Sequence, residues 1–404
     1  MIPRRVFLRD GSLAVVGLSM VPGFLARTLH AAGPSATRKT LVVLFQRGGA
    51  DGLNMVVPFS ERAYYDYRPS LAIPAPGQEN GAVDLDGKFG LHPALGALAP
   101  LFKSKQFGII NAVGTPDTGN RSHFQAQDFM ESAAPGDRTV SSGWLNRYLV
   151  EVPDPDHKPL RATAIGASLP KALRGQASVM TFGSVGQVDA MGGDMYQSMY
   201  SADTNALISG TARELFDAVK QIKSAKLEQY TPANGAAYGN AQPGPSLQQI
   251  AQLIKADVGL QVAFVDVNGW DTHQNQSERM PPLLRALAQA ITAFHTDLGK
   301  KMEDVVVLTM SEFGRTAREN GNAGTDHGHA NLMFVSGGAV KGGTVYGKWP
   351  GLDRERLNED RDLVLTTDFR DVLAELLVGH LGCTNPNAIF PKFRVDRAKF
   401  QGLL

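Results

Sequence analysis

Short apolar runs recur along the chain, and each is bounded by polar or glycine-rich turns. The runs at 39–45, 107–113, 161–166, 260–267, 305–309 and 331–335 are mostly continuous and rich in β-branched residues. Such runs are typical of strands that are covered on both faces. Longer segments with apolar residues at helical spacing lie between them, at 61–68, 92–102, 122–132, 141–150, 204–230, 246–257, 276–301 and 367–380. This alternation predicts an α/β fold with a mostly parallel central sheet.

The segment from 260 to 338 predicts one βαβ unit. A strand at 260–267 leads into an Asp-x-His loop, a helix follows at 276–301, and a strand at 305–309 leads into a second polar loop. A right-handed parallel crossover places both loops at the same edge of the sheet, where open α/β sheets bind their ligands. We therefore expect one shared site. Its candidate metal ligands are Asp271, His273, Glu312, Asp326, His327 and His329, and Arg315 is a candidate clamp for an anion.

Imidazole and carboxylate groups together suit Zn²⁺, Mn²⁺ or iron, so we interpret Asp271 and His273 as metal ligands. The alternative is a polar turn in which Trp270 closes the edge of the core. Asp51 lies in a glycine-rich segment after the first strand. It is equally well interpreted as a metal ligand or as a turn-forming residue beside Gly52.

Ser122 precedes an amphipathic helix, after a strand and a polar loop. A serine at this place can be a nucleophile, because the positive end of the helix stabilises an oxyanion and binds anions. It can also be a simple N-cap, which is the commoner role of such serines. Arg121 and His123 flank it, and both could face an anionic substrate.

Composition and charge exclude some kinds of site and partner but do not identify a function. The 404 residues carry 40 Lys and Arg against 39 Asp and Glu, so nothing indicates a nucleic-acid partner. Cys383 is the single cysteine, which excludes an intrachain disulfide and a cysteine-based zinc cluster. The hydrophobic fraction of 43% is that of a globular protein with a large core.

The N-terminal 33 residues have a basic start, an apolar stretch and small residues at the end, which is the architecture of an export signal. The segment 4–9, RRVFLR, resembles the twin-arginine consensus. The alternative is a basic amphipathic helix of the mature protein. We expect a twin-arginine signal peptide at 1–32, a single domain at 33–404, the twin-arginine translocase as a partner, and a location in the periplasm or cell envelope. The cleavage motif near Ala31 fits loosely, so retention as an anchor stays open.

Six motifs in this order resemble the bacterial DUF1501 family of twin-arginine-exported proteins: QRGGADGLN, RSHFQAQDFMES, GWLNRYL, GWDTHQNQ, SEFGRT and GTDHGHAN. That family is grouped with the alkaline phosphatase and sulfatase superfamily. The resemblance implies an alkaline-phosphatase-like three-layer sandwich that holds one or two divalent metals, whose identity among Zn, Mn, Ca and Mg is open. It also implies a Ser122 nucleophile, a ligand at Asp51, the pair Asp271 and His273, and the group Asp326, His327 and His329.

Three features depart from the superfamily pattern. Asp51 lies six residues beyond Phe45, the 305–309 strand is followed by Ser311 and Glu312 instead of Asp-His, and the sulfatase Cys/Ser-x-Pro-x-Arg motif is missing. These departures concern catalysis more than metal binding. The leading expectation is a metal-dependent hydrolase of phosphate, sulfate or related small anionic esters. A non-catalytic envelope protein that keeps the fold is the alternative, and an oxidoreductase, for which no cofactor fingerprint exists, ranks last.

Overall fold

The computed structural model describes residues 38–117, 121–184, 216–222 and 230–404. Nine strands in this part of the chain form one sheet in the order β11-β5-β10-β9-β1-β8-β6-β7, with β14 beside β5. Their bounds are β1 Thr40–Gln46, β5 Phe107–Gly114, β6 Ala162–Ile165, β7 Met180–Phe182, β8 Val262–Val267, β9 Val305–Met310, β10 Asn331–Gly337, β11 Val345–Tyr346 and β14 Thr367–Asp368. Short strands β2 Val56–Val57, β3 Val83–Asp84, β4 Gly90–Leu91, β12 Leu357–Asn358 and β13 Asp362–Leu363 form two small sheets.

The central sheet is parallel except at one strand. β1 pairs in parallel with β8 on one side and with β9 on the other. β10 runs antiparallel to both β9 and β5. The prediction of a mostly parallel sheet is therefore confirmed, and the crossover from β8 through a helix to β9 is the predicted βαβ unit.

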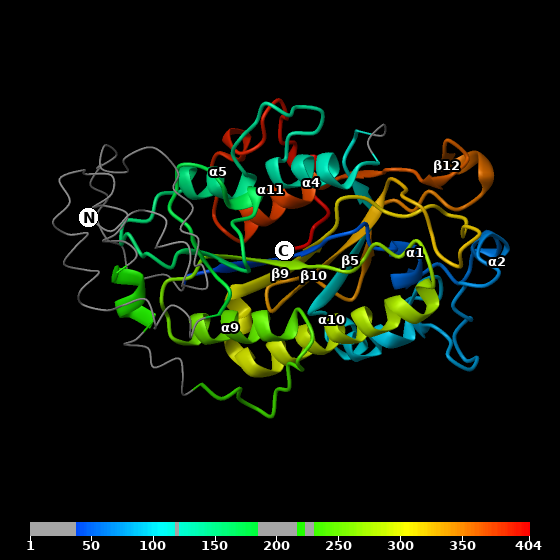
Figure 1. Ribbon diagram of the computed structural model, residues 1–404, viewed down its shortest axis with the longest axis horizontal. Coiled ribbons are helices and arrows are strands. Elements are labelled where there is room, and N and C mark those ends of the chain that lie inside the picture. The colour runs from blue at the N-terminus through cyan, green and yellow to red at the C-terminus, as the bar shows by residue number, and fades with distance from the viewer. Residues whose placement is uncertain (1–37, 118–120, 185–215, 223–229) are drawn as a thin grey trace, which may run out of the picture.

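Helices cover both faces of the sheet and make three layers (Figure 1). Helices α9 (Gly244–Lys255) and α10 (Gln276–Leu298) lie on one face. Helices α4 (His123–Ser132), α5 (Trp144–Glu151) and α11 (Phe369–Gly379) lie on the other. Shorter helices are α1 Gly52–Met55, α2 Arg62–Tyr67 and α3 Ala99–Lys103, with 3₁₀ turns at η2 Pro93–Leu98, η3 Lys171–Leu173, η5 Gly299–Asp304, η6 Arg354–Arg356, η7 Pro386–Ala388 and η8 Arg397–Lys399.

Strand β1 shows why the predicted strands read as continuous apolar runs. Val42 and Leu44 belong to the core that includes α9 and α10, whereas Leu41, Val43 and Phe45 belong to the core that includes α11. Successive side chains of a strand point to opposite faces, so a strand between two helical layers needs an apolar residue at every position.

Two predictions concern segments that lie wholly or partly outside the described residues. The predicted signal peptide at 1–32 lies outside them. Of the helix expected at 204–230, residues 216–222 are described and helical, while Tyr230 is described and is not helical. Within the described ranges, no helix has the length and apolar character that crossing a membrane requires.

Buried histidines in the core make the stability of this fold depend on pH. His380 is 2% exposed, its Nε2 donates to the Thr40 carbonyl at 2.9 Å, and its Nδ1 has no partner among the described residues. Burial lowers the pKa of His380 to about 4, and it lowers the pKa of His295 to about 4 as well. Both rings are therefore neutral in the folded protein at pH values where the unfolded chain already binds protons.

We expect the free energy of unfolding to fall as the pH is lowered from about 6.5 to about 4, by up to about 1.4 kcal/mol per pH unit for each such histidine. Urea denaturation at a series of pH values measures this slope. His380→Gln keeps a donor for the Thr40 carbonyl but cannot be protonated, so its slope should be smaller than that of the wild type. An unchanged slope would contradict the assignment to His380.

Candidate functional site

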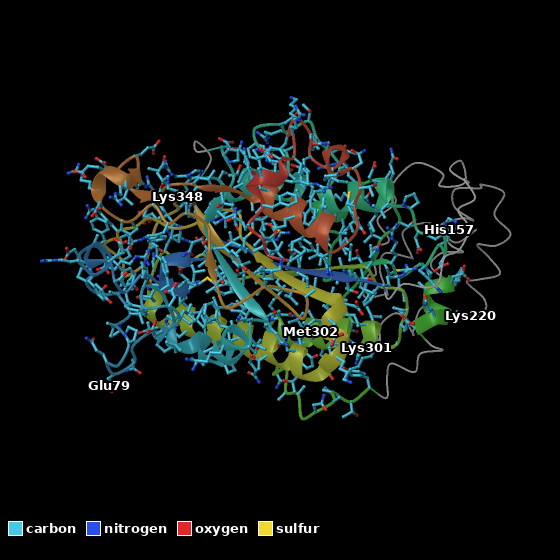
Figure 2. All side chains as sticks on the ribbon, turned by 180° about the vertical axis from the view of Figure 1, so that it is seen from behind. Glu79, His157, Lys220, Lys301, Met302 and Lys348 are labelled. Atoms are coloured by element: carbon cyan, nitrogen blue, oxygen red, sulfur yellow. The ribbon has the colours of Figure 1, made fainter. Side chains whose placement is uncertain are left out.

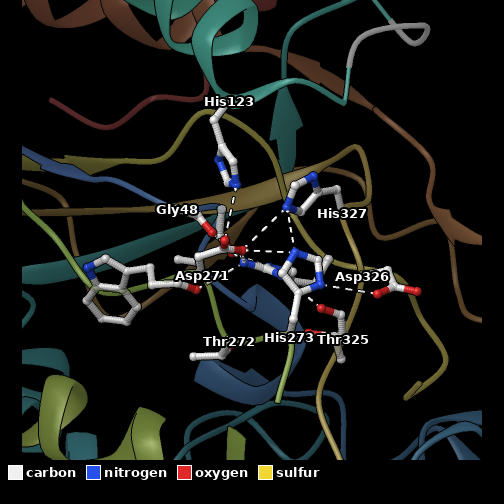
Figure 3. Close-up of polar contacts among 12 residues, drawn as sticks. Gly48, His123, Asp271, Thr272, His273, Thr325, Asp326 and His327 are labelled. Carbon is white, nitrogen blue, oxygen red and sulfur yellow. Dashed lines mark hydrogen bonds and ion pairs between the residues drawn. The ribbon is translucent and has the colours of Figure 1, made fainter. Parts of the chain in front are cut away.

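Several chain segments meet at one edge of the sheet and bring their polar side chains together (Figure 3). β1, β8, β9 and β5 all end at this edge and lead into loops there. β10 runs the opposite way, so the loop that precedes it, which carries His327, reaches the same edge. The loops after β8 and β9 therefore lie at the same edge of the sheet, as the predicted βαβ unit requires.

Three imidazole rings surround the carboxylate of Asp271. Its Oδ1 lies 3.1 Å from Nε2 of His273 and 3.4 Å from Nε2 of His327, and its Oδ2 lies 3.5 Å from Nε2 of His123. The two Nε2 atoms of His273 and His327 are 2.8 Å apart. Asp271 is 47% exposed and His273 is 36% exposed at their side chains, so the cluster is open to a ligand from solvent.

The opposite nitrogen of each ring faces a hydrogen-bond acceptor. Nδ1 of His123 lies 2.7 Å from Oε1 of Glu312, Nδ1 of His273 lies 3.2 Å from Oδ1 of Asp326, and Nδ1 of His327 lies 2.9 Å from the Arg121 carbonyl. Ionised carboxylates and carbonyls only accept, so each Nδ1 carries the hydrogen. In a neutral ring, Nε2 is then an unprotonated acceptor, and all three such atoms face the cluster.

This arrangement has the donor set of a metal site. His123, Asp271 and His327 each offer one ligand atom, and these atoms lie within 4.8 Å of one another. Nε2 of His123 is buried and has no hydrogen-bond partner among the described residues. Unprotonated nitrogens at 2.8 Å repel each other unless a proton or a cation lies between them. Three imidazoles and one carboxylate are the nitrogen and oxygen ligands that zinc and related divalent ions take, so the group could hold a metal.

Arg315 holds Asp271 in place. Its guanidinium is fully buried and donates from an Nη atom to Oδ1 of Asp271 at 2.6 Å. It also donates to the carbonyls of Gly49, Thr325, Trp270 and Gly48. Burial raises the pKa of Asp271, but the hydrogen bond and the charge of Arg315, together with the neighbouring His273 and His123, keep that pKa below its usual range. Arg315, predicted as an anion clamp, therefore has its donors directed to the protein and not to the open side of the cluster.

Glycine is required where the loop after β1 meets Asp271. Gly48 has φ +120°, and a Cβ at this position would lie 2.5 Å from the backbone nitrogen of Asp271. The close approach lets the Gly48 carbonyl reach Arg315 and its N–H donate to Oε1 of Glu312 at 2.9 Å.

Glu312 supports His123 from behind the cluster. It is fully buried, and Oε1 accepts from Nδ1 of His123 and from Nε2 of Gln127 at 2.8 Å. Burial raises the pKa of the Glu312 carboxyl, but these hydrogen bonds outweigh it and hold the pKa below its usual range. The hydrogen bond to Glu312 in turn raises the pKa of His123. Predicted as a metal ligand, Glu312 instead uses its oxygens on protein donors.

Asp51 lies in a different polar group. Arg68 donates to both of its oxygens, at 2.7 and 3.0 Å, and Gln276 donates to Oδ2 at 2.5 Å. Asp51 and Arg68 are 1% and 0% exposed at their side chains. Both oxygens of Asp51 therefore accept hydrogen bonds within a buried polar group. None of the described contacts joins these oxygens directly to the histidine cluster, so the geometry gives no support to Asp51 as a metal ligand.

The remaining predicted residues lie around the cluster or beside it. Asp326 contacts His273 and is half exposed. His329 is buried, with Nε2 2.8 Å from the Thr115 carbonyl. Arg121 pairs with Glu359 and Asp362. Ser122 is exposed at the N-cap of α4, and its side chain makes no capping hydrogen bond to the helix.

Two supporting residues were missed by the sequence analysis. Gln127 lies one helical turn after His123, and residues four apart share a helix face. The spacing of these two residues in the segment RSHFQAQ therefore indicated that both side chains face the same side of α4. Arg68, the partner of Asp51, carried no local signal because it follows α2 in a segment that reads as surface.

Replacing Glu312 by glutamine should weaken metal binding by about 10- to 100-fold, because it removes the charge that fixes the orientation and basicity of His123. Competition of Zn²⁺ or Mn²⁺ against a chelator measures the dissociation constant. Glu355→Gln, at an exposed position of η6, is the matched control. Equal affinities in the two variants would contradict the supporting role.

Replacing Arg68 by methionine should lower the free energy of unfolding by about 3–5 kcal/mol, because the Asp51 carboxylate is left buried without its partner. Chemical denaturation measures the loss. Arg62→Met, whose side chain is 92% exposed, should change stability by less than about 1 kcal/mol. The double variant Arg68→Met with Asp51→Leu should recover most of the loss, and failure to recover would argue against a purely structural pair.

Comparison with known proteins gives one family match and several distant structural likenesses. No curated protein matches the sequence. The zinc complex of the C-terminal periplasmic domain of EptC from Escherichia coli is 9% identical, over 75% of this chain and 74% of that one, with a TM-score of 0.31. Alkaline phosphatase from the Antarctic bacterium TAB5 is 12% identical, over 75% and 92% of the two chains, with a TM-score of 0.31. At these scores no residue role is transferred to this chain.

The family model described as "Protein of unknown function (DUF1501)" matches residues 92–389, which include α4, both loops of the βαβ unit and β10. The match extends over more than half of the chain. It confirms the family expected from the six motifs. The chain therefore belongs to the DUF1501 family.

Proposed function

We propose that this protein is a divalent-metal-dependent hydrolase of phosphate, sulfate or related anionic esters. The observation that supports the proposal is the convergence of three Nε2 atoms, from His123, His273 and His327, on the half-exposed carboxylate of Asp271. These four side chains would hold the ion. A structural site is closed by its protein ligands, whereas a catalytic one stays accessible, and Asp271 and His273 face solvent here.

A divalent ion in this position supplies Lewis-acid charge to an oxygen of the phosphoryl or sulfuryl group. The chain itself prepares the site for that charge. Arg315 holds Asp271, and Glu312, Asp326 and the Arg121 carbonyl hold the three rings by Nδ1. Buried Arg315 also adds positive charge close to the cluster, which favours an anionic ligand.

Ser122 is the proposed nucleophile. It directly precedes His123, it is exposed, and it occupies the N-cap of the ten-residue helix α4. The unpaired N–H groups and the dipole at a helix start favour negative charge on an attacking or transferred oxygen. As the serine oxygen bonds to phosphorus or sulfur, the bond from that atom to the ester oxygen would break, and the alcohol would leave with the serine proton. Water would then hydrolyse the serine ester, which releases phosphate or sulfate and restores the hydroxyl.

Export is part of the proposal. The twin-arginine-like segment at 4–9 supports passage through the twin-arginine translocase to the periplasm or cell envelope. Substrates would then be esters that are present in that compartment.

The test uses the chain without its signal segment, loaded separately with Zn²⁺, Mn²⁺, Mg²⁺ and Ca²⁺. Turnover is measured on p-nitrophenyl phosphate, bis(p-nitrophenyl) phosphate and p-nitrophenyl sulfate. Asp271→Asn and His327→Ala should lose bound metal and lower turnover by about 100-fold or more, because the Lewis-acid contribution is worth several kcal/mol. Ser122→Ala should keep the metal and lose turnover.

His157→Ala is the matched control, because His157 is an exposed histidine near one end of the molecule (Figure 2) and is not part of the cluster. It should change neither metal content nor turnover. Full turnover by Ser122→Ala would remove this residue as the nucleophile and leave a water mechanism. Bound metal without turnover on any ester would favour the alternative of a non-catalytic envelope protein.

A further inference from the structure

A buried glutamine, Gln276, lies where the loops of the candidate site meet. It is 1% exposed at the start of α10. Its Oε1 accepts hydrogen bonds from the hydroxyls of Thr272 and Thr325, both at 2.8 Å, and its Nε2 donates to Oδ2 of Asp51 at 2.5 Å. One side chain thus connects the loop after β1, the loop after β8 and the loop before β10.

The ion pair of Asp51 and Arg68 determines how the amide of Gln276 is oriented. The Asp51 carboxylate, which accepts from Arg68 at 2.7 and 3.0 Å, offers only acceptors, so Nε2 of the amide must face it. Oε1 then faces the two threonines, and each hydroxyl donates its single hydrogen to it. Because buried polar groups without partners are costly, the amide and both hydroxyls have one favourable arrangement.

The two threonines lie directly beside residues of the histidine cluster. Thr272 stands between Asp271 and His273 in the sequence and is 1% exposed, whereas its two neighbours are open to solvent. Thr325 is fully buried and precedes Asp326, whose Oδ1 faces Nδ1 of His273. The N–H of Thr325 also donates to the Thr272 carbonyl at 3.3 Å. In the view of Figure 3, both threonines lie on the side of the cluster away from His123.

We propose that Gln276 is a positioning residue for the metal site. It holds the loop after β8 against the loop before β10, and it thereby sets the distance between the side chains of Asp271 and His327. The inference rests on the proposed function only in that the cluster holds a divalent ion. It also gives Asp51 a role at the site, because the carboxylate acts on the two loops through the amide of Gln276 and not by facing the ion.

Binding of Co²⁺ tests the inference, because the visible absorption of the bound ion depends on its coordination number and geometry, and no substrate is needed. Gln276→Met keeps the length of the side chain and removes its polar atoms. It should weaken Co²⁺ binding by about 10-fold and change the absorption spectrum, since outer contacts of a metal site typically contribute about 10- to 100-fold to affinity. Ile250→Val, at a fully buried position of α9, is the control for lost stability and should change neither affinity nor spectrum.

Further variants keep the test decisive if Gln276→Met does not fold. Thr272→Val and Thr325→Val preserve the shape of each side chain and remove only the hydroxyl, and each should weaken Co²⁺ binding and alter the spectrum. Gln276→Glu places a second carboxylate against Asp51 and should also weaken binding. Adding Asp51→Asn to Gln276→Glu reverses the direction of the hydrogen bond between the two residues and should recover much of the affinity.

The outcomes separate the inference from the proposed function. Wild-type affinity and spectrum in folded Gln276→Met, or in both threonine variants, would show that the inference is wrong and leave the proposed function intact. An equal loss of affinity in Ile250→Val would overturn it as well, because stability and not position would then explain the effect. If the variants behave as expected but the metal-loaded wild type hydrolyses no ester, the proposed function fails and the positioning role is supported. A wild type that binds no Co²⁺ overturns both.

Discussion

The candidate site depends on the buried guanidinium of Arg315. Its hydrogen bonds join three loops that are far apart in the sequence: the loop after β1 through Gly48 and Gly49, the loop after β8 through Trp270 and Asp271, and the loop before β10 through Thr325. A planar group with five donors in fixed directions can bind several carbonyls and one carboxylate together. Without this residue, the carbonyls of these loops would lie buried without donors, and the position of Asp271 relative to the histidines would not be defined.

The polar residues around the cluster fall into two roles. Four side chains face the centre, and a second group, made of Glu312, Asp326 and the Arg121 carbonyl, holds the rings from behind. Such outer contacts determine which ring nitrogen is protonated and so which nitrogen is available to a ligand. The orientation of the three rings is therefore defined by these outer contacts.

Much of the fold was predictable from the sequence, because its main strands are buried on both faces and read as continuous apolar runs. β1, β5, β8 and β9 each lie where such a run does. The reversed direction of β10 was missed, although the sequence indicated it: the segment between β9 and β10 contains no helix signal, and parallel neighbours need a crossover that is usually a helix. β7 lies in a glycine-rich segment and has only three residues, too few for a pattern.

The sequence indicated which residues lie near one another at the candidate site, but it did not indicate what each of them contacts. Asp271, His273 and His327 meet as the βαβ geometry requires, and His123 joins them from α4. A carboxylate can face the centre of the histidine cluster, or it can pair with a buried arginine. Which of the two occurs depends on contacts between distant parts of the fold. The pairing of Glu312 with His123 is of this kind, since the two residues are 189 positions apart in the sequence. Asp51 is only 17 positions from Arg68, but Arg68 follows α2 in a segment that reads as surface.

The reversed strand β10 has a consequence for how this site can change over evolution. Residues 311–330 connect β9 to β10 at one edge of the sheet and do not have to cross a helical layer. The crossover from β8 to β9, in contrast, includes α10, whose apolar residues are committed to the core. Buried residues such as Phe313 and Arg315 hold most of this loop in place, but residues 321–323 are exposed. Insertions at 321–323 would alter the surroundings of the site while leaving the packing of both helical layers unchanged.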